Sequence, residues 1–215
     1  MDRRLGIERP EGPPFTLNNT VDLLMKREFD IARREQKATI LMQQYSIDAV
    51  PLEHPDLADW RDPWKGITAL HEPTQFIFFG AVDDVWVNTD GELLIVDYKA
   101  TSSQEEVSLR HAWKDSYKRQ IEMYQWLFRH NGFVVSDMAY FVYVNADKGR
   151  ESFDGRLEFT TRILPYKGND DWVDDALAEA KICLFKETLP QAAANCEWCA
   201  YRKEAATIEV PNSKL

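Results

Sequence analysis

Two strand-like segments joined by a short turn constrain the fold of this chain more than any other feature. Residues 75–88 are rich in Phe, Val, Ile and Trp, residues 92–100 contain the run Leu-Leu-Ile-Val, and Thr89-Asp90-Gly91 lies between them. Aromatic and β-branched residues favour strands, and a turn containing Asp-Gly favours a hairpin. The sequence therefore predicts an antiparallel strand pair.

The rest of the chain shows helical and strand patterns with an irregular stretch between them. Apolar residues at three-to-four spacing and alternating apolar residues predict helices over 16–37, 103–130 and 170–186, and strands over 138–145 and 156–164. Ser103 and Glu106 form a capping-box pattern at the start of the second helix. Four prolines predict an irregular connection over 46–74. This order predicts an α/β or α+β fold, a sheet with helices on its faces.

The composition suits a folded protein in an aqueous compartment. The chain has 215 residues, 44% apolar and 29% charged, and no apolar run approaches the roughly 20 residues that cross a bilayer. Its start lacks the apolar stretch of a signal peptide, which predicts a cytoplasmic protein and no membrane partner. The net charge of −10 argues against nucleic acid as a ligand, although a local groove matters more than the sum.

Acidic residues interrupt the apolar rows of both predicted strands. Asp83 follows Ile77, Phe79 and Ala81 on one side of the first strand, and Asp97 follows Leu93 and Ile95 on the second. Lys99 lies on the same face as Asp97, two positions later. A buried carboxylate is costly without a cation or several donors. These positions are therefore candidates for a functional site.

The length of the turn decides which acids meet. A two-residue turn would place Asp84 opposite Asp97, whereas the three-residue turn favoured by Gly91 would place Asp83 there. Two facing carboxylates, about 5 Å apart at Cβ, form a hard oxygen site for Mg²⁺ or Mn²⁺. With Lys99 at the rim, they would supply the parts for metal-assisted phosphodiester hydrolysis. The alternative is an Asp–Lys ion pair beside a turn.

Three segments in order resemble a known family. Gly80-Ala-Val-Asp83, Val96-Asp97-Tyr98-Lys99 and Gln120-Ile-Glu-Met-Tyr124 are similar to the motifs of the PD-(D/E)XK nuclease superfamily, in particular its RecB-like and CRISPR-associated exonuclease-like branch. The resemblance implies a restriction-endonuclease-like core, a mixed central sheet flanked by helices. It implies one nuclease-like domain over residues 1–190 and a C-terminal tail over 191–215.

The resemblance also implies roles for single residues. Asp83 and Asp97 would hold Mg²⁺ or Mn²⁺ with the Tyr98 carbonyl, and Lys99 would be the catalytic lysine. Gln120 and Tyr124 would support that lysine or touch the DNA backbone, although Tyr124 equally fits an ordinary core aromatic.

The first predicted helix offers two further candidate metal ligands. Many RecB-like members carry a metal-binding His there, and Asp22 stands at that position in this chain. Glu28 is a second candidate on the same helix. Both residues are also readily explained as solvated helix charges.

The implied function is a divalent-metal-dependent DNA nuclease, exonuclease-type, acting on single strands or duplex ends. Residues 110–130 hold five basic and two acidic residues, so Lys114, Lys118 and Arg119 are candidates for phosphate contacts. Alternatives are a catalytically inactive nucleic-acid-binding module on the same fold and an acidic protein with no nucleic-acid role.

The cysteines suggest a second metal site that is incomplete. Cys196 and Cys199 have metal-ligand spacing, and relatives of this branch often hold an iron–sulfur cluster with four cysteines. Cys183 is the remaining cysteine and is predicted to be a helix core residue. A degenerate iron–sulfur site, a Zn²⁺ site completed elsewhere and free thiols all remain open.

Overall fold

The structure is a computed structural model that describes residues 16–111, 114–194, 196, 198, 199 and 202. The chain divides into two compact units, Met1–Asp174 and Asp175–Leu215. No helix within the described ranges is both long and apolar enough to cross a membrane. The domain boundary at residue 190 and the cytoplasmic location stay predictions.

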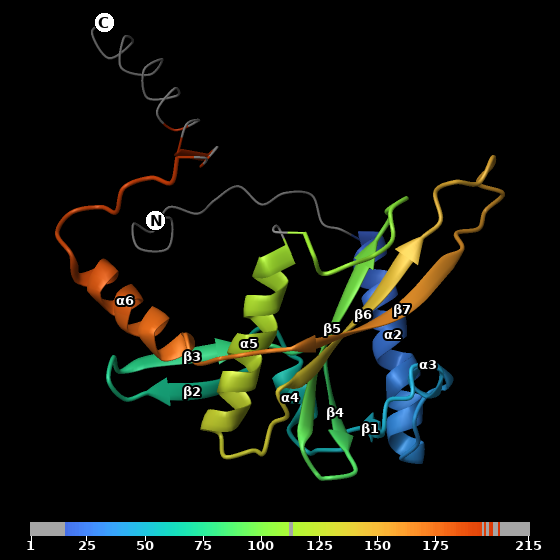
Figure 1. Cartoon of the computed structure of the whole chain (residues 1–215), viewed down its shortest axis with the longest axis horizontal. Helices are drawn as coiled ribbons and strands as arrows, with labels where there is room; N and C mark the ends of the chain where they lie inside the picture. The colour runs from blue at the N-terminus through green and yellow to red at the C-terminus, as the bar shows by residue number, and fades with distance from the viewer. Residues whose placement is uncertain (1–15, 112–113, 195, 197, 200–201, 203–215) are drawn as a thin grey trace, which may run out of the picture. The chain divides into compact units, whose positions relative to one another are not determined.

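The first unit contains most of the secondary structure (Figure 1). In chain order its elements are α2 (Thr16–Glu35), α3 (Ile40–Gln44), β1 (Ala49–Pro51), α4 (Leu57–Trp60), β2 (Ile67–His71), β3 (Phe76–Gly80), β4 (Asp84–Asn88), β5 (Leu93–Thr101), α5 (Asp115–His130), β6 (Met138–Ala146) and β7 (Phe159–Lys167). The next helix, α6 (Val173–Phe185), begins at the end of this unit and continues into the second.

Five strands form a mixed sheet in the order β1-β4-β5-β6-β7. β5 is antiparallel to β4 and parallel to β6, and the outer pairs β1–β4 and β6–β7 are antiparallel. A parallel pair requires a crossover connection, and α5 lies in the segment that joins β5 to β6. The predicted mixed sheet with flanking helices is confirmed.

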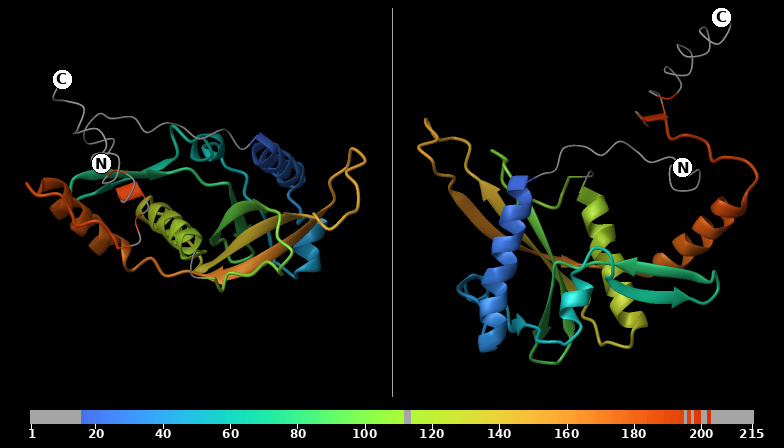
Figure 2. Two further views of the ribbon diagram at one scale, coloured as in Figure 1. Left: turned by 90° about the horizontal axis from the view of Figure 1, so that it is seen from above. Right: turned by 180° about the vertical axis from the view of Figure 1, so that it is seen from behind.

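Helices α2 and α5 pack against opposite faces of β5, which lies between them in Figures 1 and 2. Met25 and Phe29 of α2 are buried in a cluster with Val96 and Tyr98. Successive side chains of a strand point to opposite faces, so Asp97 and Lys99 point away from that cluster. Lys99 accordingly bonds to Gln120 of α5. The two faces of β5 thus carry different chemistry.

The strand predicted over residues 75–88 is two strands that belong to different sheets. β3 pairs with β2 in a separate two-stranded sheet, whereas β4 pairs with β1 and β5. The chain must therefore leave one sheet and enter another between Gly80 and Asp84. The continuous apolar row was a wrong prediction, since Ile77 and Phe79 are 73% and 49% exposed.

Two other expectations about local structure were wrong. The connection over 46–74 contains β1, α4 and β2, elements of three to five residues that are too short to give a periodic signal. The second helix begins at Asp115 rather than Ser103. Ser103 instead exchanges two hydrogen bonds with Asn145 of β6, which anchors the irregular segment to the sheet. Trp113, a predicted member of the helix stripe, lies outside the described residues.

Candidate functional site

The hairpin register brings the position of Asp83 opposite Asp97. Asp84 pairs with Val96 and Val85 with Ile95, so the turn is the three-residue type. Gly91, its third residue, has a φ of +81°, the left-handed conformation that this turn requires and that glycine adopts without strain. The predicted register is confirmed.

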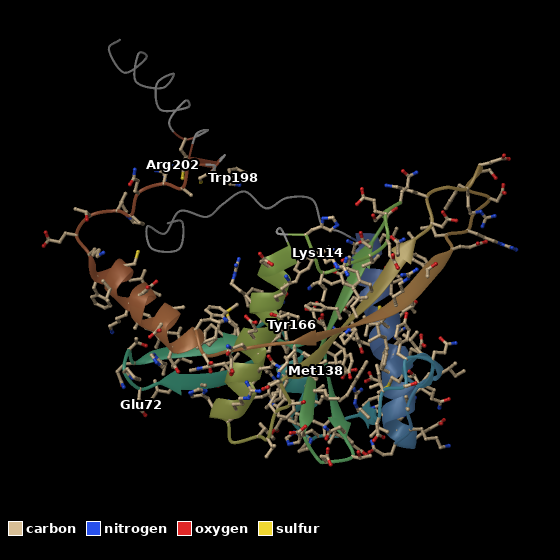
Figure 3. All side chains as sticks on the ribbon, in the orientation of Figure 1. Glu72, Lys114, Met138, Tyr166, Trp198 and Arg202 are labelled. Atoms are coloured by element: carbon tan, nitrogen blue, oxygen red, sulfur yellow. The ribbon has the colours of Figure 1, made fainter. Side chains whose placement is uncertain are left out.

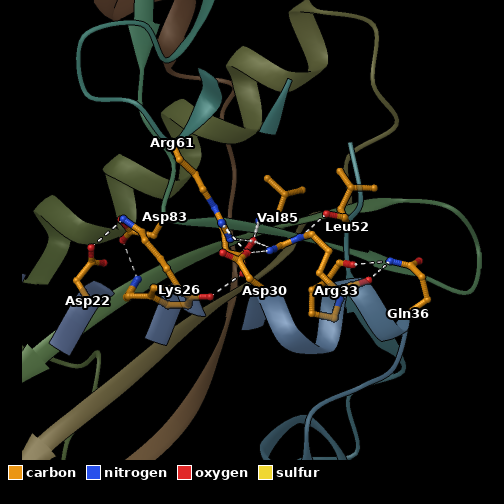
Figure 4. A network of polar contacts seen from close by, with 12 residues as sticks. Asp22, Lys26, Asp30, Arg33, Gln36, Leu52, Arg61, Asp83 and Val85 are labelled. Atoms are coloured by element: carbon orange, nitrogen blue, oxygen red, sulfur yellow. Dashed lines mark hydrogen bonds and ion pairs between the residues drawn. The ribbon is translucent and has the colours of Figure 1, made fainter. Parts of the chain in front are cut away.

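Asp84, the rival of Asp83, points to the face of β5 covered by α2 and is fully bound there. Its carboxylate is 0% exposed, is paired with Arg33, and lies 2.8 Å from Nη2 of Arg61. It also accepts hydrogen bonds from the Tyr98 hydroxyl, at 2.6 Å, and from the backbone N–H of Val85, at 2.8 Å. Figure 4 shows the side chains of Arg33 and Arg61 pointing toward one another beside Val85. A carboxylate so bound has no capacity left for a metal ion.

Asp97 is buried to the same degree and has far fewer partners. It is 1% exposed, and Lys99 Nζ lies 2.6 Å from its Oδ2 atom. Among the described residues, neither carboxylate oxygen accepts a hydrogen bond of acceptable geometry. Burial, and then repulsion from Asp83, outweigh the attraction of Lys99 and raise the pKa of Asp97 to about 7. This carboxylate is held in a place where a further cation would stabilise its charge.

Asp83 lies at the rim, between β5 and α2. Its Oδ2 atom accepts a hydrogen bond from the Tyr98 backbone N–H at 2.8 Å, and its Oδ1 atom lies 3.3 Å from Lys26 Nζ. Lys26 also lies 2.9 Å from Asp22 (Figure 4). Partial burial lowers the pKa of Lys26, but the neighbouring Asp83 and Asp22 raise it above its ordinary value. Asp22 is thus linked to Asp83 by the ammonium group of Lys26, which contacts both.

A chain of polar contacts holds Lys99 in place. Lys99 Nζ donates to Gln120 Oε1 at 3.3 Å, and Gln120 Nε2 donates to the Tyr124 hydroxyl at 2.9 Å. Because Tyr124 takes the amide N–H₂, the amide oxygen of Gln120 is turned toward the lysine. Burial raises the pKa of Tyr124 to about 12, so its hydroxyl stays protonated at neutral pH. The ammonium also lies 4.6 Å above the ring of Tyr117.

Gly80 gives Tyr124 the space it occupies. A Cβ atom at Gly80 would lie 2.6 Å from Cε1 of Tyr124, closer than real Cβ contacts allow. Any larger side chain would push the ring away and carry its hydroxyl off Gln120. The glycine of the Gly-x-x-Asp segment is therefore required by the approach of α5 to the end of β3.

Two hollows meet at Lys99. One, of about 310 Å³, is lined by residues that include Asp22, Asp83 and Tyr98, and the other, of about 290 Å³, by residues that include Lys114 and Tyr143. Both are lined by Lys99, Ala100 and Tyr117. The candidate lysine therefore lines both hollows.

The sequence of the chain matches the family model of the PD-(D/E)XK nuclease superfamily over residues 16–203. The chain belongs to this superfamily. Its mixed sheet with flanking helices agrees with the restriction-endonuclease-like fold, and members of the superfamily are in general nucleases. No curated protein matches the sequence.

Among solved structures, a crystal structure of SSO0001 matches this PD-(D/E)XK protein with 20% identity and a TM-score of 0.32, over 60% of this chain and 50% of that one. The chain thus spans about half of the length of SSO0001.

The three basic residues proposed for phosphate contacts lie in different surroundings in this PD-(D/E)XK protein. Lys114, labelled in Figure 3, is 5% exposed with Nζ 4.7 Å from the ring centre of Tyr143. Burial lowers the pKa of Lys114. Lys118 is paired with Asp115 at 2.8 Å, and Arg119 is exposed. Lys114 is the member of the set that lines a hollow beside Lys99.

The other predicted ligands are scattered. Glu28 is exposed on α2, and the Tyr98 side chain is turned toward Asp84, so only the backbone of Tyr98 could face the site. Within the described ranges, no three His, Cys, Asp or Glu side chains form a metal-binding group. Cys196 and Cys199 have their Sγ atoms 2.8 Å apart, and two thiols do not complete a four-ligand iron–sulfur or zinc site. Cys183 is half-buried rather than a core residue.

Sequence reasoning missed the basic residues that balance the acids. Lys26 is four positions after Asp22 on α2, a spacing that could have suggested a pair. Arg33 and Arg61 meet Asp84 only because α2 and α4 are folded against the sheet, and no local pattern indicates this. These three residues decide which acids stay available.

Proposed function

We propose that this protein is a divalent-metal-dependent DNA nuclease with Asp83, Asp97 and Lys99 at its catalytic centre. The observation that carries the proposal is the state of Asp97, a fully buried carboxylate with a lysine beside it and no hydrogen bond to either oxygen among the described residues. Burying such a charged group costs free energy unless it binds a cation. Its neighbour across the hairpin, Asp83, is a second hard oxygen donor.

The donor set fits Mg²⁺ or Mn²⁺, which take carboxylate and carbonyl oxygens. Asp83 and Asp97 would hold the ion, with the Tyr98 carbonyl and water, and Asp22 is a further candidate. A bound ion of this kind polarises a phosphodiester and activates water. Lys99, fixed between Asp97 and Gln120, would neutralise the phosphate or orient the attacking water. Gln120 and Tyr124 would act as positioning residues through Lys99.

The substrate proposal is DNA at single strands or duplex ends, with exonuclease action. The order of the three motifs, which resembles RecB-like nucleases, supports this part. The two hollows that Lys99 lines add support, because a polynucleotide extends beyond the phosphate that is cut. In an acidic protein such a substrate must be drawn in by local groups such as Lys99, Lys114 and Arg119 rather than by the net charge.

A second candidate function is a nucleic-acid-binding module without catalysis. The specific observation in its favour is that lysines already neutralise the acids: Lys26 lies between Asp22 and Asp83, and Lys99 lies on Asp97. A site filled by its own ammonium groups could bind a phosphate chain without taking up a metal ion.

Incubation of end-labelled single-stranded and duplex DNA with Mg²⁺ or Mn²⁺ separates the two candidates. The nuclease proposal predicts metal-dependent cleavage by the wild type and by Asp90→Asn, a change at an exposed turn residue, and a strong loss of cleavage by Asp97→Asn. Retained DNA binding with no cleavage by the wild type under any of these conditions supports the binding module and contradicts the nuclease. Shortening from one end, as opposed to internal cuts, tests the exonuclease part.

A further inference from the structure

The ammonium group of Lys26 occupies a position between two acidic side chains of the proposed centre. Its Nζ atom lies 2.9 Å from Asp22 Oδ2 and 3.3 Å from Asp83 Oδ1, and Figure 4 shows the side chain reaching toward both acids. The Lys26 side chain is 22% exposed, so it is partly withdrawn from water.

This contact is more than an exposed helix pair. Asp22 and Lys26 are four residues apart on α2, and pairs of that kind stabilise a helix only slightly. Asp83 belongs to a different element, and its own position is fixed by the hydrogen bond from the Tyr98 backbone. Lys26 therefore joins α2 to the hairpin and contacts two of the carboxylates that are candidate metal ligands.

The charges of the centre are close to balanced when only one divalent ion is added. Three carboxylates (Asp22, Asp83 and Asp97) face two ammonium groups (Lys26 and Lys99), which leaves one negative charge when all are ionised. One divalent ion reverses that charge, and a second would leave a large positive excess. A second ion would also need the oxygens that Lys26 already contacts.

We propose that Lys26 is a tethered cation that takes the place of a second divalent ion, so that the centre binds a single metal ion on Asp97 and Asp83. This inference rests on the proposed metal-dependent function. It assigns to Asp22 the role of an anchor for Lys26 in place of a direct ligand. Two-metal phosphodiesterases place their ions about 3.5–4 Å apart, and Lys26 already contacts the Asp22 and Asp83 oxygens that a second ion would need.

Titration of the full-length, DNA-free protein with Mn²⁺, followed by calorimetry and by electron paramagnetic resonance, tests the proposal. The wild type is expected to bind one Mn²⁺ per chain. Lys26→Met removes the charge and keeps the length of the side chain, and it is expected to bind two, with the spectrum of a coupled ion pair. Lys26→Arg keeps the charge and should bind one.

Two further variants make the count specific to this position. Lys37→Met removes a lysine that is 73% exposed, just after α2, and should leave the count at one. In the double variant Asp22→Asn, Lys26→Met the second ion loses a ligand, so the count should return to one. Thermal unfolding of each variant identifies the folded fraction to which the count is referred.

The difference between Lys26→Met and the wild type decides this proposal, and the wild-type count decides the proposed function. A gain of one ion supports the tethered cation, whereas an equal count in both proteins overturns it. Two ions in the wild type also overturn it, because Lys26 would then have been displaced. No Mn²⁺ in the wild type contradicts the metal-dependent function, whatever the variant shows.

Discussion

Asp84 and Asp97 lie on opposite faces of one hairpin, and the comparison between them separates structure from function. Both are essentially unexposed. Asp84 has two arginines, a tyrosine hydroxyl and a backbone amide, whereas Asp97 has a lysine and no hydrogen bond of acceptable geometry among the described residues. Burial alone therefore does not identify a functional acid, because the number of its partners decides whether it can bind anything else.

Replacing each of the two aspartates by asparagine tests this comparison most clearly, and the largest effect on stability is expected at Asp84. Asp84→Asn leaves Arg33 and Arg61 buried beside a neutral group, and loss of one partner from a buried charge cluster costs about 3–5 kcal/mol. That is a large share of a total stability of roughly 5–15 kcal/mol. Denaturant unfolding should show this loss. An unfolding free energy equal to that of the wild type would contradict the structural role of Asp84.

Asp97→Asn should have the opposite profile. It removes a carboxylate whose ionised form has little support in the metal-free protein, so its free energy of unfolding at neutral pH should be no lower than that of the wild type. Its cleavage rate should fall on the order of 10³-fold, because a ligand of the activating ion is lost. Rates measured with saturating Mn²⁺ check this, and activity within tenfold of the wild type would remove Asp97 from the centre.

Lys99→Met sharpens the comparison on the functional face. Loss of one positive group aimed at the reacting phosphate is worth roughly 10²–10³-fold in rate. Since Lys99 is also the main counter-charge of Asp97, the variant should bind Mn²⁺ at least as tightly as the wild type. Single-turnover cleavage together with Mn²⁺ titration measures both. Weaker Mn²⁺ binding together with an unchanged cleavage rate at saturating Mn²⁺ would show that Lys99 acts only on the ion.

The two acids should also differ in their effect on stability against pH. The pKa of Asp97 is raised to about 7 in the folded protein, so between about pH 4 and 7 the folded state holds a proton that the unfolded state has released. Stability of the metal-free wild type should therefore fall as pH rises through this window, by at most about 1.4 kcal/mol per pH unit from this group. Asp97→Asn should lack that part of the slope, and an unchanged slope in the variant would contradict the shift.

The smallest expected effect concerns the support of Lys99. Tyr124→Phe removes the acceptor of the Gln120 N–H₂ group, which costs about 1 kcal/mol and less than tenfold in rate. Tyr140→Phe, which alters a ring stacked on Trp86 on the other face, is the matched control and should not change the rate. Equal rates for all three proteins would show that the Gln120–Tyr124 pair does not position Lys99.

Much of the fold follows from local pattern. The helices near both ends and the strands β5, β6 and β7 are long enough for their apolar periodicity to be visible, and Gly91 determined the hairpin register. The break between β3 and β4 was not visible, because each half looks equally strand-like and only their different partners separate them. Short elements such as α4 and β1 depend on contacts from distant parts of the chain.

The candidate site divides in the same way. Asp97 and Lys99 could be predicted because a charged pair interrupted an apolar strand. The length of the turn predicted that Asp83, and not Asp84, faces Asp97. The reason that Asp84 is unavailable is that Arg33 and Arg61 bind it, and this could be seen only in the tertiary structure. The contact of Lys26 with Asp83 joins a helix to a hairpin across a long stretch of sequence, so neither spacing nor composition could reveal it.

The most direct test of the central claim, that Asp97 is kept available for a cation, is thermal unfolding with and without Mn²⁺. At a Mn²⁺ concentration of about 100 times Kd, binding to the folded state adds about 2.7 kcal/mol, which corresponds to roughly 5–10 °C in Tm for a protein of this size. The wild type should show this rise and Asp97→Asn should not. Equal rises in both proteins, or none in the wild type, would contradict the claim.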